Sequence, residues 1–199
     1  MTVLPLPARD PADLVRDQRQ AVASWQRDTT LRLAQDPGNE ADREAQMDAR
    51  RHLAALQRTR SAVLECQARR QRSLPLSDDA PRAVVVLRDE WRRARITAEL
   101  SDLGVHVVGE GEDGAVALAM VIVEQPELLV IEDRLPWVTP LEVVSQAHRY
   151  APRTAVAVQL EDSSEAGQLL DAGAAAVVGR GVRLAELCEC CVEALRPSA

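Results

Sequence analysis

The stretch PELLVIEDRLP, residues 126–136, carries the clearest fold signal in the chain. Its apolar run from Leu128 to Ile131 is typical of a strand that is buried on both faces. Two carboxylates, Glu132 and Asp133, follow at once, and a Leu-Pro turn ends the stretch. Functional groups of parallel sheets gather at the carboxyl ends of the strands, so these acids mark a candidate site.

Similar apolar runs recur on both sides of this stretch and alternate with helical segments. The expected strands span 83–87, 105–109, 127–132, 154–160 and 174–179. The expected helices span 90–103, 113–124, 139–149, 163–172 and 183–195. Five apolar strands that alternate with five helices predict an α/β domain, with a doubly wound parallel sheet and right-handed crossovers.

The N-terminal part, residues 1–72, has helical character instead. A break at Asp36-Pro37-Gly38 separates two helical stretches, and Asn39 can cap the second, which runs to about Arg72. Small and apolar residues of the second stretch follow a heptad spacing: Ala45, Ala49, His52, Leu56, Thr59, Val63 and Cys66. We therefore predict a helical hairpin for dimerisation or partner docking, whose partner is a second copy, the other domain or another protein.

A Pro-containing polar stretch, SLPLSDDAP at 73–81, is typical of a linker, so residues 82–199 form the second predicted domain. The charge is divided unevenly between the two parts. Residues 1–72 hold 13 Arg against 10 acids, and residues 73–199 hold 11 Arg against 21 acids. The chain has no lysine. This asymmetry indicates two modules with different roles.

The helical stretch at 50–72 is strongly basic. Its arginines include Arg50, Arg51 and Arg58, and Glu65 is its one acid. We interpret these arginines as a solvated face or as contacts to an acidic partner, the acidic second domain included. Nucleic acid is the least expected partner, because the net charge is −7 and no helix-turn-helix signature is visible.

No apolar run reaches the length of a signal peptide or a membrane span, so we expect a cytoplasmic protein without membrane contact. The four cysteines are too few for a disulfide framework. Three of them, Cys188, Cys190 and Cys191, lie in one predicted helix, where small buried hydrophobes are the expected role. A redox or metal role is the alternative.

The segment 83–195 resembles the receiver domain of bacterial two-component response regulators. The likeness lies in DLGVHVVGEGEDGAVAL (102–118), PELLVIEDRLP (126–136) and DAGAAAVVGR (171–180), which occur in the family's order and spacing. The resemblance implies a flavodoxin-like or CheY-like sheet with strand order 2-1-3-4-5. It also implies a role in two-component phosphorelay signalling, with no enzymatic activity of its own.

The resemblance further implies a phosphoacceptor pocket, and this chain departs from it. Two acids after the first strand hold Mg²⁺ in the family, but here Arg88 precedes Asp89 and Glu90. The phosphoacceptor Asp of the third strand corresponds to Glu132. A longer side chain displaces the carboxylate, and a guanidinium repels the metal. A weak Mg²⁺ site at Asp89, Glu90 and Glu132 is the alternative to a pocket without a cofactor.

The remaining family positions are altered too. The hydroxyl residue of the fourth strand corresponds to Leu160, the aromatic residue of the fifth strand to Val177, and the lysine after it to Arg180. We expect Glu132 and Asp89 to pair with Arg180 and Arg88, and so to fill the vestigial pocket with ion pairs. Asp133 is the alternative phosphoacceptor.

The chain is therefore expected to be an atypical response regulator whose degenerate receiver binds a protein without phosphorylation. Trp91 and Trp137, near the carboxyl edge of the sheet, are candidate partner contacts or a lid over the pocket. One alternative is a regulator phosphorylated on Glu132 or Asp133. Another is a nucleic-acid-binding regulator that uses the Arg-rich helix at 50–72.

Overall fold

The computed structural model describes residues 40–72 and 80–195, together with residues 20, 23, 24, 27, 28, 30–32 and 34. Five parallel strands form one sheet in the order β2-β1-β3-β4-β5. The strands are β1 (Arg82–Val86), β2 (His106–Gly111), β3 (Leu128–Glu132), β4 (Ala155–Leu160) and β5 (Ala176–Gly179). Both the fold class and the strand order predicted from the sequence are confirmed.

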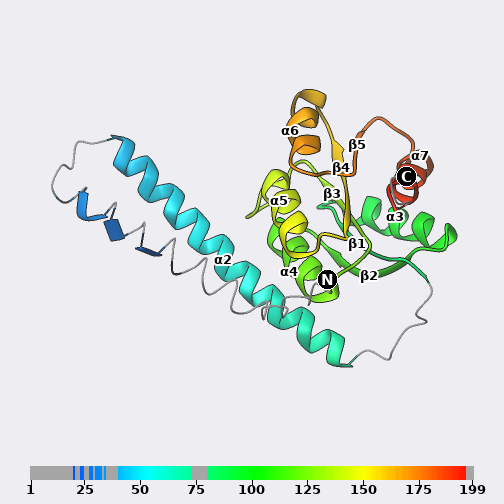
Figure 1. Cartoon of the computed structure of the whole chain (residues 1–199), viewed down its shortest axis with the longest axis horizontal. Helices are drawn as coiled ribbons and strands as arrows, with labels where there is room; N and C mark the ends of the chain where they lie inside the picture. The colour runs from blue at the N-terminus through cyan, green and yellow to red at the C-terminus, as the bar shows by residue number, and fades with distance from the viewer. Residues whose placement is uncertain are drawn as a thin grey trace, which may run out of the picture.

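Helices connect the strands and lie on both faces of the sheet (Figure 1). They are α3 (Glu90–Asp102), α4 (Gly114–Glu124), α5 (Pro140–Tyr150), α6 (Ala166–Asp171) and α7 (Leu184–Ala194). A short 3-10 turn, Ser163–Glu165, precedes α6. Each predicted strand and helix of this domain is present, with ends shifted by a few residues.

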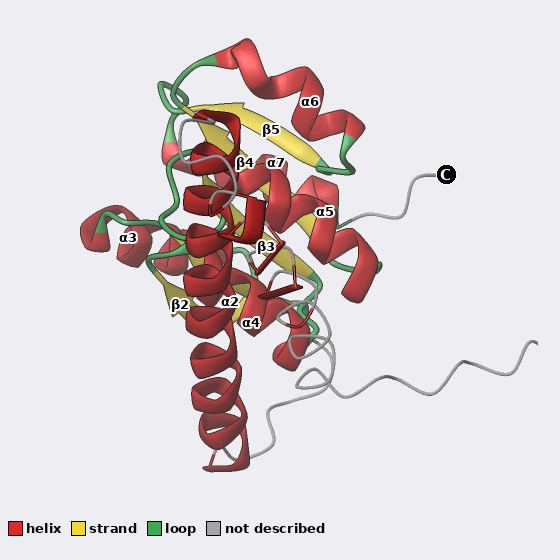
Figure 2. Cartoon of the chain, turned by 90° about the vertical axis from the view of Figure 1, so that its left-hand side faces the viewer, coloured by secondary structure: helices red, strands yellow, loops and turns green. Residues whose placement is uncertain are grey.

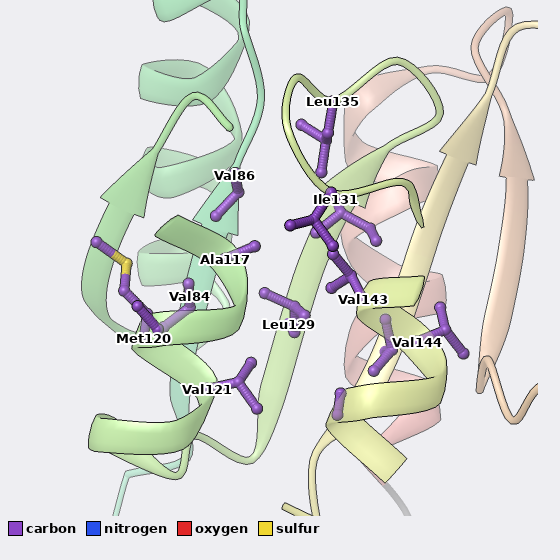
Figure 3. Packing of buried hydrophobic residues seen from close by; sticks show 14 of the residues in the cluster. Val84, Val86, Ala117, Met120, Val121, Leu129, Ile131, Leu135, Val143 and Val144 are labelled. Atoms are coloured by element: carbon purple, nitrogen blue, oxygen red, sulfur yellow. The ribbon is translucent and has the colours of Figure 1, made fainter. Parts of the chain in front are cut away.

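The side chains of each strand alternate between two hydrophobic cores, because successive residues of a strand point to opposite faces. The first core lies between the sheet and α4, α5 and α6, and the second lies between the sheet and α3 and α7. Figure 3 shows the first core, where these buried side chains meet: Val84, Val86, Ala117, Met120, Val121, Leu129, Ile131, Leu135, Val143 and Val144.

A long N-terminal helix, α2 (Glu40–Arg72), crosses the outer side of α4 (Figure 2). Its N-terminal end extends beyond the α/β body (Figure 1). From residue 55 onward, the buried residues of α2 are Ala55, Thr59, Ala62, Val63 and Cys66. The small side chains of this stripe allow the two helix backbones to approach closely, and α2 thereby joins the first core.

The sequence of α4, GAVALAMVIVE, explains why a further helix covers it. The helix is apolar on every side, and such a helix is stable in water only when it is buried all round. The sheet covers one side of α4, and α2 covers much of the rest. The sequence left three possible partners for the helix that starts after Asn39. Among the described residues, this helix packs against the other domain of the same chain.

The predicted heptad pattern holds only in part. Ala49, Thr59, Val63 and Cys66 are buried, whereas His52 is exposed. The buried stripe of α2 packs on the short helix α4 and not on a second long helix. The residues that face α4 therefore include Ala55 and Ala62, which are not part of the predicted heptad.

The described residues between 20 and 34 are helical, and two contacts join them to α2. Arg32 Nε donates to Asp42 Oδ1 over 3.1 Å, and Gln46 Nε2 donates to Thr30 Oγ1 over 3.0 Å. These contacts agree with the predicted hairpin. The predicted break at 36–38 and linker residues 73–79 lie outside the described residues.

In the described part of the chain, no helix is both long enough and apolar enough to cross a bilayer.

Candidate functional site

The end of β3 carries the acid that the sequence analysis placed at the phosphoacceptor position. Glu132 is only 5% exposed, and its register partner in β4 is Gln159. The carboxylate of Glu132 does not project into solvent, because Oε1 accepts a 2.6 Å hydrogen bond from the backbone N–H of Arg88. A charge-assisted bond of this kind holds the β1–α3 loop against the end of β3.

The expected pairs Glu132–Arg180 and Asp89–Arg88 are wrong. The Arg88 side chain is exposed, and only the backbone of this residue reaches Glu132. Asp89 caps α3 by accepting from the backbone N–H of Arg92. Arg88 begins an exposed loop, where its guanidinium keeps its hydration and avoids the cost of burial.

Arg180, which was expected to pair with Glu132, lies near a different acid, Glu161. Arg180 Nη1 is 3.9 Å from Glu161 Oε2, and Arg134 Nη2 lies closer to the same oxygen, at 3.1 Å. All three side chains are well exposed, so these pairs add little stability.

The side chain beside Glu132 is Gln159, and the prediction that Leu160 lines this pocket is wrong. Leu160 belongs to the first core, on the opposite face of the sheet from Gln159. The error is one residue of register, and a shift of one residue along a strand exchanges the two faces.

A buried polar pair lies next to Glu132. Arg92 Nη2 donates to Gln159 Oε1 over 2.7 Å. The Nε of Arg92 and the Nε2 of Gln159 are buried and have no hydrogen-bond partner among the described residues. An amide thus occupies the place beside Glu132, where the resemblance implies a hydroxyl.

The geometry of these acids does not fit Mg²⁺. The described residues contain no group of three or more His, Cys, Asp and Glu side chains that could hold a metal ion. Asp89 is engaged as a helix cap and Glu132 is bound to a backbone amide, whereas Mg²⁺ requires several oxygens in near-octahedral geometry. The structure thus does not gather Asp89, Glu90 and Glu132 into a set of Mg²⁺ ligands.

Asp133, the alternative phosphoacceptor, joins two loops at this edge. Its backbone N–H donates to Gln159 O over 2.9 Å, and its Oδ2 accepts from the backbone N–H of Glu161 over 2.7 Å. The carboxylate therefore ties the loop after β3 to the loop after β4.

A second polar contact, which the sequence analysis missed, joins α2 to the α/β body. Arg58 Nε and Nη2 donate to Asp113 Oδ2 over 3.1 and 3.0 Å. Asp113 is 4% exposed, and its Oδ1 caps α4 by accepting from Val116 N. The signal in the sequence was an acid placed directly before a helix that is apolar on every side.

The loop after β3 rests on the same end of α4. Gly114 N donates to Pro136 O over 3.0 Å, and a Cβ on Gly114 would lie 2.1 Å from Val138 O. Trp137 lies between these two loop residues and has a φ of 71°, a left-handed conformation that favours glycine.

The other candidate partner contacts lie at the surface. Trp91 is 65% exposed, with the Arg95 guanidinium 5.0 Å from its ring centre, and Trp137 is 57% exposed. Arg50 is exposed, and Arg51 lies 3.4 Å from Asp48.

The thiols of α7 are buried in the second core. Burial, followed by the charge of Glu99, raises the pKa of Cys188 to about 11. Burial, followed by the neighbouring thiols Cys188 and Cys190, raises the pKa of Cys191 to about 12. A thiol that stays protonated is a poor nucleophile and a poor metal ligand, in keeping with the expected role as small hydrophobes.

The strand order and the alternating helices decide the fold. Residues 82–195 form a receiver domain fold. The signal receiver domain of the response regulator NarL from Mycobacterium tuberculosis is similar, with a TM-score of 0.56 and 24% identity over 60% of this chain and 98% of that chain.

Two further receiver structures match at similar levels. A CheY-like receiver domain protein from Methanospirillum hungatei JF-1 has a TM-score of 0.55 and 23% identity, over 59% of this chain and 94% of that chain. The response regulator domain of Thermotoga maritima CheB has a TM-score of 0.55 and 18% identity, over 60% of this chain and 99% of that chain. No family model and no curated protein matches the chain. The receiver fold is shared, and the pocket residues differ from those the fold's family implies.

Proposed function

We propose that this chain is an atypical, cytoplasmic response-regulator-like protein without enzymatic activity, whose receiver fold binds a protein partner independently of phosphorylation. One contact carries the proposal: the backbone N–H of Arg88 holds the carboxylate of Glu132 at the end of β3. A carboxylate bound in this way serves as a structural tie between two loops. It is not placed for the metal-assisted attack on a phosphoryl group that the receiver family performs.

Two further features support the same proposal. The buried amide of Gln159 takes the place beside Glu132, and the guanidinium of Arg92 is hydrogen-bonded to it. The place beside Glu132 is therefore occupied by polar groups of the protein itself.

The partner in this proposal is a protein rather than a nucleic acid. Arg58 of the basic helix is engaged by Asp113 within the chain, and Arg50, Arg51 and Arg60 are the exposed arginines of that stretch in the part that the structure describes. Three exposed arginines among the described residues make a small phosphate-binding footprint. A homodimer through the N-terminal helices remains part of the proposal, because the N-terminal end of α2 extends beyond the body (Figure 1).

Acetyl phosphate with Mg²⁺, followed by intact mass measurement, tests the proposal. We expect no gain of a phosphoryl group in the full chain, and none in the Glu132→Asp variant, because Mg²⁺ has no set of ligands there. A phosphoryl gain in the native chain that disappears in Asp133→Asn would instead establish Asp133 as a phosphoacceptor. A gain that disappears only in Glu132→Gln would establish Glu132.

A further inference from the structure

A groove of about 490 Å³ lies between α2 and the body. Its apolar lining comes from three segments: Ala55 and Leu56 of α2, Leu118 of α4, and Trp137 and Val138 of the loop after β3. Ligand-binding clefts for small organic molecules have volumes of roughly 300–1,000 Å³ and a mainly apolar lining with a few polar groups. This groove has that size and that character.

Polar side chains line the groove on two sides. On α2 these are Arg51, His52 and Thr59, and on the opposite side they are Thr139, Glu142 and Gln146. His52 Nε2 lies 3.4 Å from Glu142 Oε1, while the other carboxylate oxygen accepts from the backbone N–H of Thr139. Glu142 is thus engaged by protein groups.

Arg51 is the basic residue of the groove whose charge is least satisfied by protein groups. Its Nη1 has a single ion pair, of 3.4 Å, with Asp48, and the Arg51 side chain is 78% exposed. A flexible, exposed pair of this kind contributes little and is easily replaced. The guanidinium can therefore bind an anionic group at the edge of the groove, where a bidentate pair is favourable.

Trp137 supplies an independent indication of a ligand. A non-glycine residue at a φ of 71° costs on the order of 1–3 kcal/mol, and such strain concentrates at functional sites. The strained backbone holds the Trp137 ring at the groove, where 57% of the residue is exposed. Burial of this ring therefore contributes little to stability.

We propose that this groove binds a small, planar aromatic anion. The aromatic body lies on the ring of Trp137 and the apolar floor, and the anionic group pairs with Arg51. The two contacts use the offset stacking that aromatic rings prefer and the charge-assisted bonds that guanidinium groups form. This site is distinct from Glu132 and does not rest on the proposed function.

Anilinonaphthalene sulfonate, an aromatic anion of suitable size, is the probe for a titration against the full chain. We expect saturable binding of one molecule per chain, with energy transfer from tryptophan to the probe that is strongly reduced in Trp137→Leu. Arg51→Gln is expected to weaken binding by about tenfold, as the loss of a charge-assisted hydrogen bond does. Arg50→Gln, a change at an exposed neighbour outside the groove, leaves the affinity unchanged.

A second variant tests the cavity itself. Gln146→Phe adds an aromatic ring at the α5 side of the groove, and we expect it to abolish binding while the circular dichroism spectrum stays native. Leu170→Phe, at a 50% exposed site on α6, is the matched control and keeps the native affinity. Equal affinity in the native chain, Arg51→Gln and Gln146→Phe, or binding that does not saturate, would overturn the proposal.

Discussion

Arg58 donates two hydrogen bonds to one oxygen of Asp113, at 3.1 and 3.0 Å, while the other oxygen of Asp113 caps α4. One buried carboxylate thus starts a helix of the α/β body and anchors the N-terminal helix across it. The guanidinium of Arg58 neutralises the carboxylate of Asp113 at an otherwise apolar interface. A buried carboxylate without such a partner would lower the stability of the fold.

Loss of Arg58 should loosen α2. In Arg58→Ala, Asp113 keeps its capping bond but loses its counter-charge, so we expect the free energy of unfolding to fall by about 1–3 kcal/mol. Urea unfolding measures the change. Alkylation of Cys66 under native conditions, located by peptide mass, should be faster in the variant, because this thiol is 4% exposed at the α2–α4 contact.

Arg60→Ala is the control for this prediction, since Arg60 is an exposed residue of the same helix. Its stability and its rate of Cys66 alkylation should equal those of the native chain. Equal alkylation rates in Arg58→Ala and Arg60→Ala would contradict an anchoring role for Arg58.

The close approach of α4 to the loop after β3 depends on a missing side chain. Gly114→Ala would place a methyl group 2.1 Å from the carbonyl oxygen of Val138, and the backbone must move to accept it. We expect a loss of about 3 kcal/mol in urea unfolding, as for overpacking of a core. Gly167→Ala, which has open space in α6, should instead be neutral or slightly stabilising. Similar losses in both variants would argue against a specific clash.

The left-handed backbone of Trp137 predicts an unusual response to a large truncation. Glycine adopts a φ of 71° without strain, and this gain of about 1 kcal/mol offsets the packing lost with a half-exposed ring. We therefore expect Trp137→Gly to unfold at nearly the native urea concentration. Trp137→Ala keeps the strain and should be less stable than Trp137→Gly, and the opposite order would show that the ring is retained for packing.

The buried thiols of α7 predict a loss of stability in alkaline solution. The pKa of Cys188 is about 11 and that of Cys191 about 12 in the folded chain, against an ordinary value of 9.0. The folded state therefore holds these protons more tightly than the unfolded state does. Their contribution to stability is full below pH 9 and decreases as the pH rises from 9 through the folded values.

Urea unfolding between pH 8 and pH 11 measures this effect. The absence of lysine removes the side chain that would otherwise dominate titration in this range. The decrease should be much smaller in a Cys188→Ala/Cys191→Ala variant, whose side chains carry no proton to lose. An identical decrease in the native chain and the variant would assign the pH dependence to other groups.

The sequence alone determined the sheet and the helices between the strands, whereas the strand order was implied by the resemblance to receiver domains. Runs such as Leu128 to Ile131 have a single stable environment, between two helical layers, so the local pattern and the global fold agree. The same pattern placed Glu132 at the end of β3. It also predicted the extent of α2 after Asn39, because the capping and breaking signals are local.

Tertiary structure decided what the polar side chains contact. Whether Glu132 pairs with Arg180 or with the backbone of Arg88 depends on loop paths that carry no periodic signal. The choice between Gln159 and Leu160 depended on the strand register, which is set by the whole sheet. The docking of α2, through Arg58 and Asp113, brings together residues 55 positions apart, and only the folded chain can bring them within hydrogen-bonding distance.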